Sequence, residues 1–278
     1  MCPNPINKVA LKLRNTITPK TLLARFVKQL SPRLLAFDEI RLGDSFDGGY
    51  VLPNCLNRIS WAVNPGVGDT ISFDIAALND YGIRGVTCDG TLDSSKISKL
   101  ALDTFAFFEP KNLGLIDSEA TICLETLTRI AQTIIRKDDE IGFGLLQLDI
   151  EGGEWEILKS KKTNLDAFGI VIVEFHGFHL AARLLSFFRF IKPTFQRLLR
   201  DFEVFHIHPN NGRGKINIHG IDMPEIMEIT FVSKKLANFN GGKTAYKRLP
   251  SYFDSDNVPE NPKIEPLRGW PGWELQRN

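Results

Sequence analysis

The stretch ISWAVNPGVGDTISFDIAALNDYGIRGVTCD, residues 59–89, decides the fold. It begins with an apolar run at 59–63 that is typical of a buried strand, and a loop with two glycines follows. A helical pattern then covers 72–82, and a second apolar run at 83–89 ends in Asp89. Strand, glycine loop, helix and strand in this order predict a right-handed βαβ unit and a parallel sheet.

The same alternation of strands and helices continues along the chain. Helices are expected at 94–102, 121–135, 154–160 and 181–200, the last one broken near Pro193. Further strands are expected at 105–109, 143–150, 169–175, 204–208 and 226–233. No helical pattern separates the last two strands, so we expect them to pair as an antiparallel hairpin. The prediction is an α/β fold whose sheet is mostly parallel.

Two flanking segments differ from this central pattern. Residues 19–30 place Leu and other apolar side chains on one helical face, which predicts a helix packed on the domain. From about residue 240 onward prolines and polar residues dominate, which is typical of an irregular arm. We therefore expect a lead segment at 1–40, a central domain at 41–240 and a Pro-rich arm at 241–278 packed on that domain.

The composition excludes several classes of function. The 278 residues carry a formal net charge of +1, which argues against a nucleic-acid binder or a polybasic membrane-surface protein. The four cysteines form no C-x-x-C pair, so a zinc site or redox pair is not expected there. No signal peptide and no run of about 18 apolar residues is seen, which predicts a cytoplasmic protein without a membrane span. The oligomeric state is not indicated.

The glycine loop and Asp89 point to a nucleotide-like cofactor. Gly66 and Gly68 allow the backbone to turn sharply and approach a ligand, and an acid at the end of the second strand accepts hydrogen bonds from ribose hydroxyls. Ile71 stands where the dinucleotide fingerprint G-x-G-x-x-G has its third glycine. The pattern favours S-adenosylmethionine over a nicotinamide-dependent dehydrogenase, and a glycine turn without a ligand is the simpler alternative.

Polar side chains gather where the later strands end, which is the edge of a parallel sheet that binds ligands. The candidates for catalysis are Asp149, Glu151, Glu174, His176 and His208. A histidine or a carboxylate at this edge can remove the proton of a hydroxyl group, with His176 and His208 as the candidate bases. Alternatively, Asp149, Glu174 and His176 would hold a divalent cation that acidifies the hydroxyl.

Some of these residues have structural alternatives. Glu151 precedes a helix, so it is equally explained as an acid that complements the helix dipole. His206 is expected to point away from His208, which makes one of the two a structural histidine. Asn210, just after the same strand, is a candidate for substrate contact.

The sequence Asp47-Gly48-Gly49-Tyr50 also allows two interpretations. It is a good β-hairpin turn, and a hairpin alone would explain it. As a functional element it would fold over the cofactor or the substrate, and Asp47 and Tyr50 would contact that molecule.

Segments along most of the chain resemble one known family. GLLQLDIEGGEWEIL, residues 144–158, resembles the signature of FkbM-type methyltransferases, and RLGDSFDGGYVL at 41–52 resembles the entry segment of one branch. VIVEFHG, VFHIHPNN and LPSYFDSDNVPENP also match in order, so the resemblance covers roughly residues 40–262. It implies a class I, Rossmann-like sheet of seven strands, S-adenosylmethionine as cofactor, and O-methylation of a small molecule or glycan.

Residue by residue, the resemblance places a cofactor site at the ends of the first, second and fourth predicted strands. Asp149 would lie beside the methionine end of the cofactor. The whole expected set is Gly66, Val67, Gly68, Asp69, Asp89, Gly90 and Asp149. Asn64-Pro65 departs from the family pattern just before the glycine loop, and motivates a second hypothesis, an inactive methyltransferase-like binding module.

Overall fold

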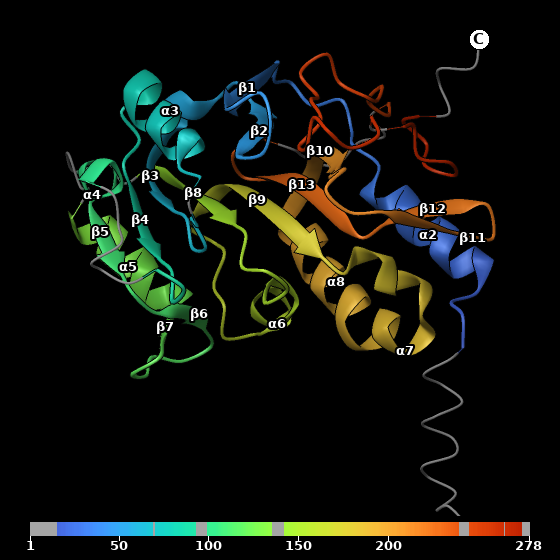
Figure 1. The fold of residues 1–278 in the computed structure, drawn as a ribbon, viewed down its shortest axis with the longest axis horizontal. Helices are drawn as coiled ribbons and strands as arrows, with labels where there is room; N and C mark the ends of the chain where they lie inside the picture. The colour runs from blue at the N-terminus through green and yellow to red at the C-terminus, as the bar shows by residue number, and fades with distance from the viewer. Residues whose placement is uncertain are drawn as a thin grey trace, which may run out of the picture.

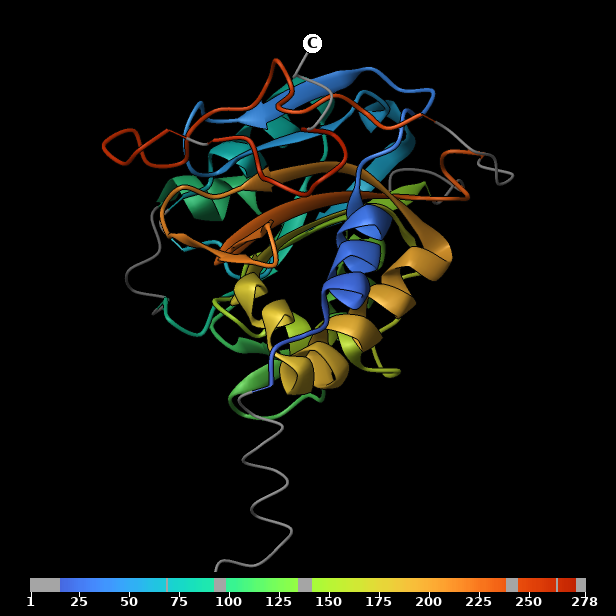
Figure 2. The same cartoon turned by 90° about the vertical axis from the view of Figure 1, so that its right-hand side faces the viewer.

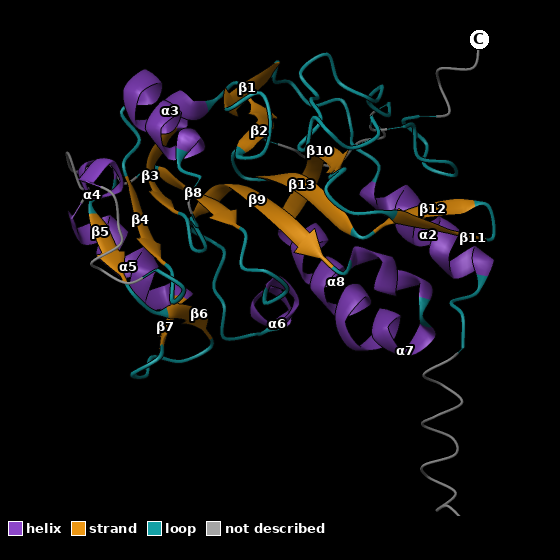
Figure 3. Ribbon diagram, in the orientation of Figure 1, coloured by secondary structure: helices purple, strands orange, loops and turns teal. Residues whose placement is uncertain are grey.

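A seven-stranded sheet forms the centre of the molecule (Figures 1 and 3). The computed structural model describes residues 16–68, 70–92, 99–134, 142–238, 245–263 and 265–273. The strand order is β10-β13-β9-β8-β3-β4-β5. The strands are β3 (Ile59–Val63), β4 (Gly85–Cys88), β5 (Phe107–Glu109), β8 (Phe143–Leu148), β9 (Phe168–His176), β10 (Phe202–Pro209) and β13 (Ile226–Ser233).

Only β13 runs against its neighbours in this sheet. It pairs antiparallel with β9 on one side and with β10 on the other, whereas the pairs among β9, β8, β3, β4 and β5 are parallel. The predicted mostly parallel sheet with an antiparallel pair at the C-terminal end is thus confirmed.

Three smaller two-stranded sheets surround the central one. β1 (Glu39–Gly43) and β2 (Gly49–Pro53) form an antiparallel hairpin, so the turn predicted at 47–50 is confirmed. β11 (Lys215–Ile218) and β12 (Ile221–Pro224) form a second hairpin inside the connection from β10 to β13, which had been expected to be a plain loop. β6 (Asn112–Gly114) and β7 (Thr121–Cys123) pair in parallel.

The helices follow the predicted pattern with shifted ends. They are α2 (Lys20–Leu30), α3 (Ser72–Tyr81), α4 (Lys99–Thr104), α5 (Leu124–Ile134), α6 (Glu154–Lys159), α7 (Leu184–Ser186) and α8 (Lys192–Asp201). Short turns of other helix types cover Leu56–Arg58, Phe178–Ala182 and Phe187–Ile191. None of the helices in these described ranges is long and apolar enough to cross a bilayer.

Two helix predictions need comment. The expected segment 94–102 falls partly outside the described residues, which resume at Lys99 in α4. The expected break near Pro193 takes the form of a π-helical turn that leads into α8, and Pro193 occupies the first turn of α8. The helical turns continue without a gap from Leu184 into α8, and the π-helical turn just before Pro193 accommodates the proline, which lacks the N–H that a carbonyl of the preceding turn would accept.

Both faces of the sheet are buried, as the period-two alternation of β9 demonstrates. Val171, Val173 and Phe175 belong to one core cluster, whereas Ile170 and Ile172 belong to the other. Residues of α2, α5, α6 and α8 complete the first cluster, and residues of α3 and the β1–β2 hairpin complete the second. Figure 2 shows the C-terminal arm and β1 on one side of the sheet and α2, α7 and α8 on the other.

An aromatic cluster around Phe195 packs α8 against α2 and against β9 of the sheet. Its ring centroid lies 5.2 Å from that of Phe26 in α2 and 5.1 Å from that of Phe175 in β9. Trp155, Phe178 and Phe231 surround it at 6.1 to 6.3 Å. The apolar face predicted for residues 19–30 is therefore part of the core, with Phe26 only 4% exposed.

The substitution Phe195→Ala is expected to lower the free energy of unfolding by about 3–5 kcal/mol, because it empties a fully packed site between five rings. Urea unfolding followed by circular dichroism measures the change. Phe188→Ala, at a residue that is 49% exposed, is the matched control and is expected to cost less than about 1 kcal/mol. Equal losses in the two variants would contradict this account of the core.

Candidate functional site

One position of the glycine loop after β3 requires glycine, because there is no space for a side chain there. Gly66 has φ +82°, and a Cβ built on it would overlap the backbone carbonyl of Asp149 at the end of β8. Its N–H donates to the carbonyl of Cys88 at 3.0 Å. Gly68 has open space around it, so there only the left-handed backbone, φ +50°, favours glycine. The loop thus packs its backbone directly against the ends of β4 and β8.

Asp89 at the end of β4 holds the glycine loop from the other side. Its Oδ2 accepts the N–H of Gly68 at 3.0 Å, and its Oδ1 accepts both the N–H and the hydroxyl of Thr91, at 2.8 and 2.6 Å. The residue is 7% exposed. Asp69, which was also expected to contact the cofactor, lies outside the described residues.

A cavity of about 470 Å³ opens between the glycine loop, β4 and β8. This volume lies within the range that is common for small-molecule sites. Of the residues singled out from the sequence, it is lined by Asp47, Gly48, Tyr50, Gly66, Val67, Gly68, Asp89, Gly90, Asp149 and Glu151. Lining residues that the sequence interpretation missed include Gln147, Thr91, Asn112 and Leu113.

Asn64, the departure from the family pattern, has a structural role. Its side chain is buried and donates a hydrogen bond to the carboxyl group of Asp74 in the first turn of α3. Burial raises the pKa of Asp74 to about 7 even though this hydrogen bond opposes the shift. The pair connects the end of β3 with the helix that follows the glycine loop.

The β1–β2 hairpin forms a wall of the same cavity. Tyr50 is 5% exposed, its hydroxyl accepts a hydrogen bond from Gln147 of β8 at 3.1 Å, and its ring packs on Phe73 of α3. Asp47 is exposed at the tip and also lines the cavity. The segment 47–50 is therefore both a hairpin turn and a part of the cavity wall.

Acids and a histidine meet beside this cavity, at the ends of β8 and β9. His176 Nε2 lies 3.3 Å from Glu151 Oε2 and 3.8 Å from Glu174 Oε1. Asp149 Oδ1 is buried and has no hydrogen-bond partner among the described residues. Asp149, Glu151 and His176 each offer a ligand atom, and these atoms lie within 4.8 Å of one another.

Glu154 orients His176 and was not among the residues predicted from the sequence. It is fully buried, and its Oε1 accepts the N–H groups of Ile150 and Gly152 at 3.1 and 3.0 Å. The same oxygen lies 3.2 Å from His176 Nδ1, so Nδ1 carries the hydrogen and Nε2 faces the acids. The spacing E-G-G-E at the start of a helix was the available signal.

The structure does not place Glu151 as the acid that complements the dipole of the following helix, the alternative considered for it. Its side chain is 87% exposed and its backbone adopts φ +54°, which is unusual for a residue other than glycine. The acid that contacts the backbone at the start of α6 is Glu154, so the helix-start role falls to that residue. Strained backbone of this kind is frequent at functional sites.

The acids at this edge are harder to ionise than acids in water. Burial raises the pKa of Asp149 to about 7. Burial and the neighbouring carboxyl group of Glu228 raise the pKa of Glu174 well above its usual value. Burial lowers the pKa of His176, but the hydrogen bond to Glu154 and the other acids outweigh it, so the pKa is raised overall. Clustered shifts of this kind favour a functional site.

His208 lies apart from this group, whereas Asn210 contacts one of its members, Glu174. His208 contacts Asp254 and Asn257 of the C-terminal arm through its two ring nitrogens and does not line the cavity. The prediction that His206 points away from His208 is wrong, because both contact Asp254 and residues two apart on a strand share a face. Asn210 is buried and donates to Glu174 Oε1 at 3.1 Å.

Comparison with known protein families gives one match. The family model described as the methyltransferase FkbM domain matches residues 46–212, which is more than half of the chain. The matched range contains the glycine loop, Asp89, Asp149 and His176, whereas Glu228 and Asp254 lie beyond it. No curated protein and no solved structure matches the chain.

The substitution Asp74→Asn is expected to remove one source of pH-dependent stability. Between pH 4 and pH 7 folded Asp74 keeps a proton that the unfolded chain has lost, so this residue stabilises the fold at low pH, and that contribution disappears as the pH rises through about 7. The free energy of unfolding of Asp74→Asn should therefore increase relative to that of the wild type across this window. Urea unfolding at several pH values measures it.

Asp80→Asn, at an exposed position on the same helix, is the matched control and should track the wild type at every pH. Parallel curves for Asp74→Asn and the wild type would show that Asp74 ionises normally in the folded protein.

Proposed function

The chain belongs to the FkbM methyltransferase family, and from that premise we propose that it binds S-adenosylmethionine in the cavity beside β3, β4 and β8 and methylates a hydroxyl group. The observation that carries the proposal is the convergence of Gly66, Asp89 and Asp149 on one cavity. The acceptor is proposed to be a small molecule or a glycan.

The strand order supports a class I, Rossmann-like assignment. From β3 the chain builds outward through β4 to β5, then returns to β8 and continues outward through β9 on the other side. The order therefore reverses between β3 and β8, and ligands of open α/β sheets bind at such a switch point. Gly66 and Asp149 lie at the carboxyl ends of these two strands.

The residues around the cavity fit the cofactor. The carboxylate of Asp89 has lone pairs for ribose hydroxyls, and its hydrogen bond to Gly68 sets its position before the ligand arrives. The backbone at Gly66 leaves room for close approach, and the first turn of α3 favours a carboxylate such as that of the methionine moiety. Asp149 Oδ1, buried without a partner, is an acceptor available to the amino group at that end.

When bound, the cofactor supplies an electrophilic methyl group on a sulfonium. The remaining chemistry falls to the acids and His176 at the ends of β8 and β9. His176 Nε2 would take the proton of the acceptor hydroxyl, and Glu154 holds the ring by accepting a hydrogen bond from Nδ1. Glu154, Asp149 and Glu151 stabilise the imidazolium that results, since these acids raise the pKa of His176. The acid-rich wall disfavours anionic acceptors and favours neutral, polyhydroxylated ones.

We also propose the division of the chain into three parts that the sequence predicts. A lead segment at 1–40 and an arm at 241–278 flank a methyltransferase unit at 41–240. The hydrogen bond that Lys247 donates to the carbonyl of Phe205, and the one between His206 and Asp254, support the packing of the arm on the unit. A cytoplasmic setting is proposed from the composition and from free cysteines at positions 55, 88 and 123.

Binding of S-adenosylmethionine or its demethylated product by calorimetry tests the cofactor part of the proposal. Asp89→Ala is expected to weaken binding about 10- to 100-fold, because it removes charge-assisted hydrogen bonds to the ribose and loosens Gly68. Asp80→Ala, an exposed acid on α3, is the control and should leave the affinity unchanged. A wild-type protein that binds neither compound would remove the proposal.

The proposed base is tested by transfer of a labelled methyl group to a broad panel of glycans and hydroxylated metabolites. His176→Gln is expected to leave cofactor affinity within about threefold and to reduce transfer about 10²- to 10⁴-fold. Because a base must be unprotonated, the wild-type rate should rise with pH through the raised pKa of His176 and then level off.

Glu154→Gln should move that rise to lower pH, since Glu154 raises the pKa of His176. Turnover that is unchanged in excess EDTA assigns proton removal to His176, whereas loss of turnover that Mg²⁺ restores assigns it to an ion held by Asp149, Glu151 and His176. A protein that binds the cofactor and methylates no acceptor would favour the inactive binding module.

A further inference from the structure

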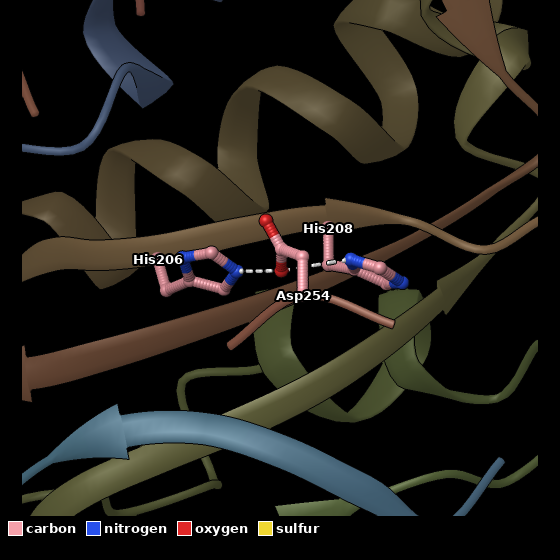
Figure 4. A group of neighbouring side chains, drawn as sticks. All are labelled: His206, His208 and Asp254. Atoms are coloured by element: carbon pink, nitrogen blue, oxygen red, sulfur yellow. Dashed lines mark hydrogen bonds and ion pairs between the residues drawn. The ribbon is translucent and has the colours of Figure 1, made fainter. Parts of the chain in front are cut away.

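A second polar centre lies where the C-terminal arm covers β10, outside the cofactor cavity. Asp254 Oδ1 lies 2.7 Å from His206 Nε2 and 3.0 Å from His208 Nδ1 (Figure 4). The side chains are only 3%, 5% and 10% exposed for His206, His208 and Asp254. Their three ligand atoms lie within 4.8 Å of one another, although Asp254 is more than 40 residues away in sequence.

The second carboxylate oxygen of Asp254 and the second ring nitrogen of His208 are already hydrogen-bonded to neighbouring residues. Asp254 Oδ2 accepts the N–H of Ser251 at 2.7 Å, which leaves Oδ1 facing the two histidines. His208 Nε2 lies 3.1 Å from Asn257 Oδ1, while the amide nitrogen of Asn257 donates to Glu228 at 2.6 Å. Since Asn257 presents an acceptor to the ring, His208 carries hydrogen on Nε2, and in the neutral ring Nδ1 is a lone pair.

His206 lies on the other side of Asp254 from His208 (Figure 4). Its Nδ1 is buried without a hydrogen-bond partner among the described residues, and Glu39 Oε1 lies 3.8 Å away. The carboxylate of Asp254 lies much closer, so without a metal ion Nε2 carries the hydrogen and donates it to Asp254 Oδ1. The ammonium of Lys247 pairs with Glu39 on the outer side of the ring. One nitrogen of each ring and one carboxylate oxygen therefore converge, and a cation bound among them would displace the hydrogen that His206 donates.

We propose that His206, His208 and Asp254 bind a divalent transition-metal ion, with zinc the ion that suits them best. Two imidazole nitrogens and one carboxylate oxygen match the ligand preferences of zinc, whereas magnesium and calcium prefer oxygen ligands alone. Ligand atoms bonded tetrahedrally to one zinc ion at about 2.1 Å lie about 3.4 Å from each other, so the separations of 2.7 and 3.0 Å found here would widen by less than about 1 Å on binding. Asn257 and Glu39 stand behind the rings, as acceptors commonly do behind metal-bound histidines.

The ion would join the arm to the edge of the sheet. Residues next to Asp254 also contact the β1–β2 hairpin, because Arg41 donates to the carbonyl of Phe253 at 3.2 Å and the N–H of Asp47 donates to the carbonyl of Asn257 at 3.3 Å. That hairpin is a wall of the cofactor cavity. The centre is therefore a structural metal site that stabilises the folded arm, and it is separate from the group formed by Asp149, Glu151 and His176.

Titration of the chelator-treated, full-length protein with Co²⁺ tests this proposal, since the visible absorption of bound Co²⁺ reports its ligands. We expect about one Co²⁺ per chain, displaced by Zn²⁺, and a rise in the melting temperature on binding. His206→Gln and Asp254→Asn should abolish binding. Asn257→Ala leaves the three ligands in place and should weaken Co²⁺ binding about 10- to 100-fold.

His176→Gln is the matched control, because it removes a histidine from the other candidate group and should leave the Co²⁺ spectrum unchanged. Circular dichroism verifies that each variant is folded, and the wild-type titration does not depend on any variant. Absence of Co²⁺ and Zn²⁺ binding by the folded wild type would overturn the proposal. Binding that is lost in His176→Gln but kept in His206→Gln and Asp254→Asn would overturn it as well.

Discussion

The close approach of the glycine loop to the end of β8 is the constraint on which the site depends. Gly66 lies so near the carbonyl of Asp149 that no side chain fits between them. This contact forms at the switch point of the sheet, where β3 and β8 lie side by side and their connections leave in opposite directions. Because the loop cannot withdraw from Asp149 without breaking the hydrogen bonds of Gly66 and Gly68, the cavity is built into the backbone and does not rely on side chains alone.

Around this contact the chain buries carboxyl groups that a stable fold does not require. Asp149, Glu174 and Glu228 follow one another across β8, β9 and β13, and burial raises the pKa of each. Such groups destabilise the folded state unless they are protonated or paired. Asn210 and Asn257 donate hydrogen bonds to Glu174 and Glu228, which offsets part of the cost. Asp149 Oδ1 has no such partner among the described residues, and this is the end of the row that opens into the cavity.

Local signals were sufficient to predict the sheet and much of the cavity. The alternation of apolar runs and helical patterns located all seven strands of the central sheet, and Gly66 and Asp89 were identified by loop chemistry. Contacts between distant segments were not predictable, because the arm has no periodicity that specifies a partner. Asp254 therefore could not be assigned to His206 from the sequence. The opposite facing assumed for His206 and His208 was an error of reasoning, since a period of two already places them together.

The C-terminal arm and the β1–β2 hairpin are hydrogen-bonded to each other beside the cavity. Arg41 at the base of the hairpin donates to the carbonyls of Asp44, Phe46 and Phe253, so one guanidinium holds both the turn and the arm. Asp47 at the hairpin tip lines the cavity and is in turn bonded to the arm through Asn257. Displacing the arm would therefore shift the wall that carries Asp47 and Tyr50, without touching the glycine loop. Under the proposed function, the residues that would hold the cofactor lie mainly at the ends of β3, β4 and β8, whereas the hairpin and the arm beside it are the segments that would contact the acceptor.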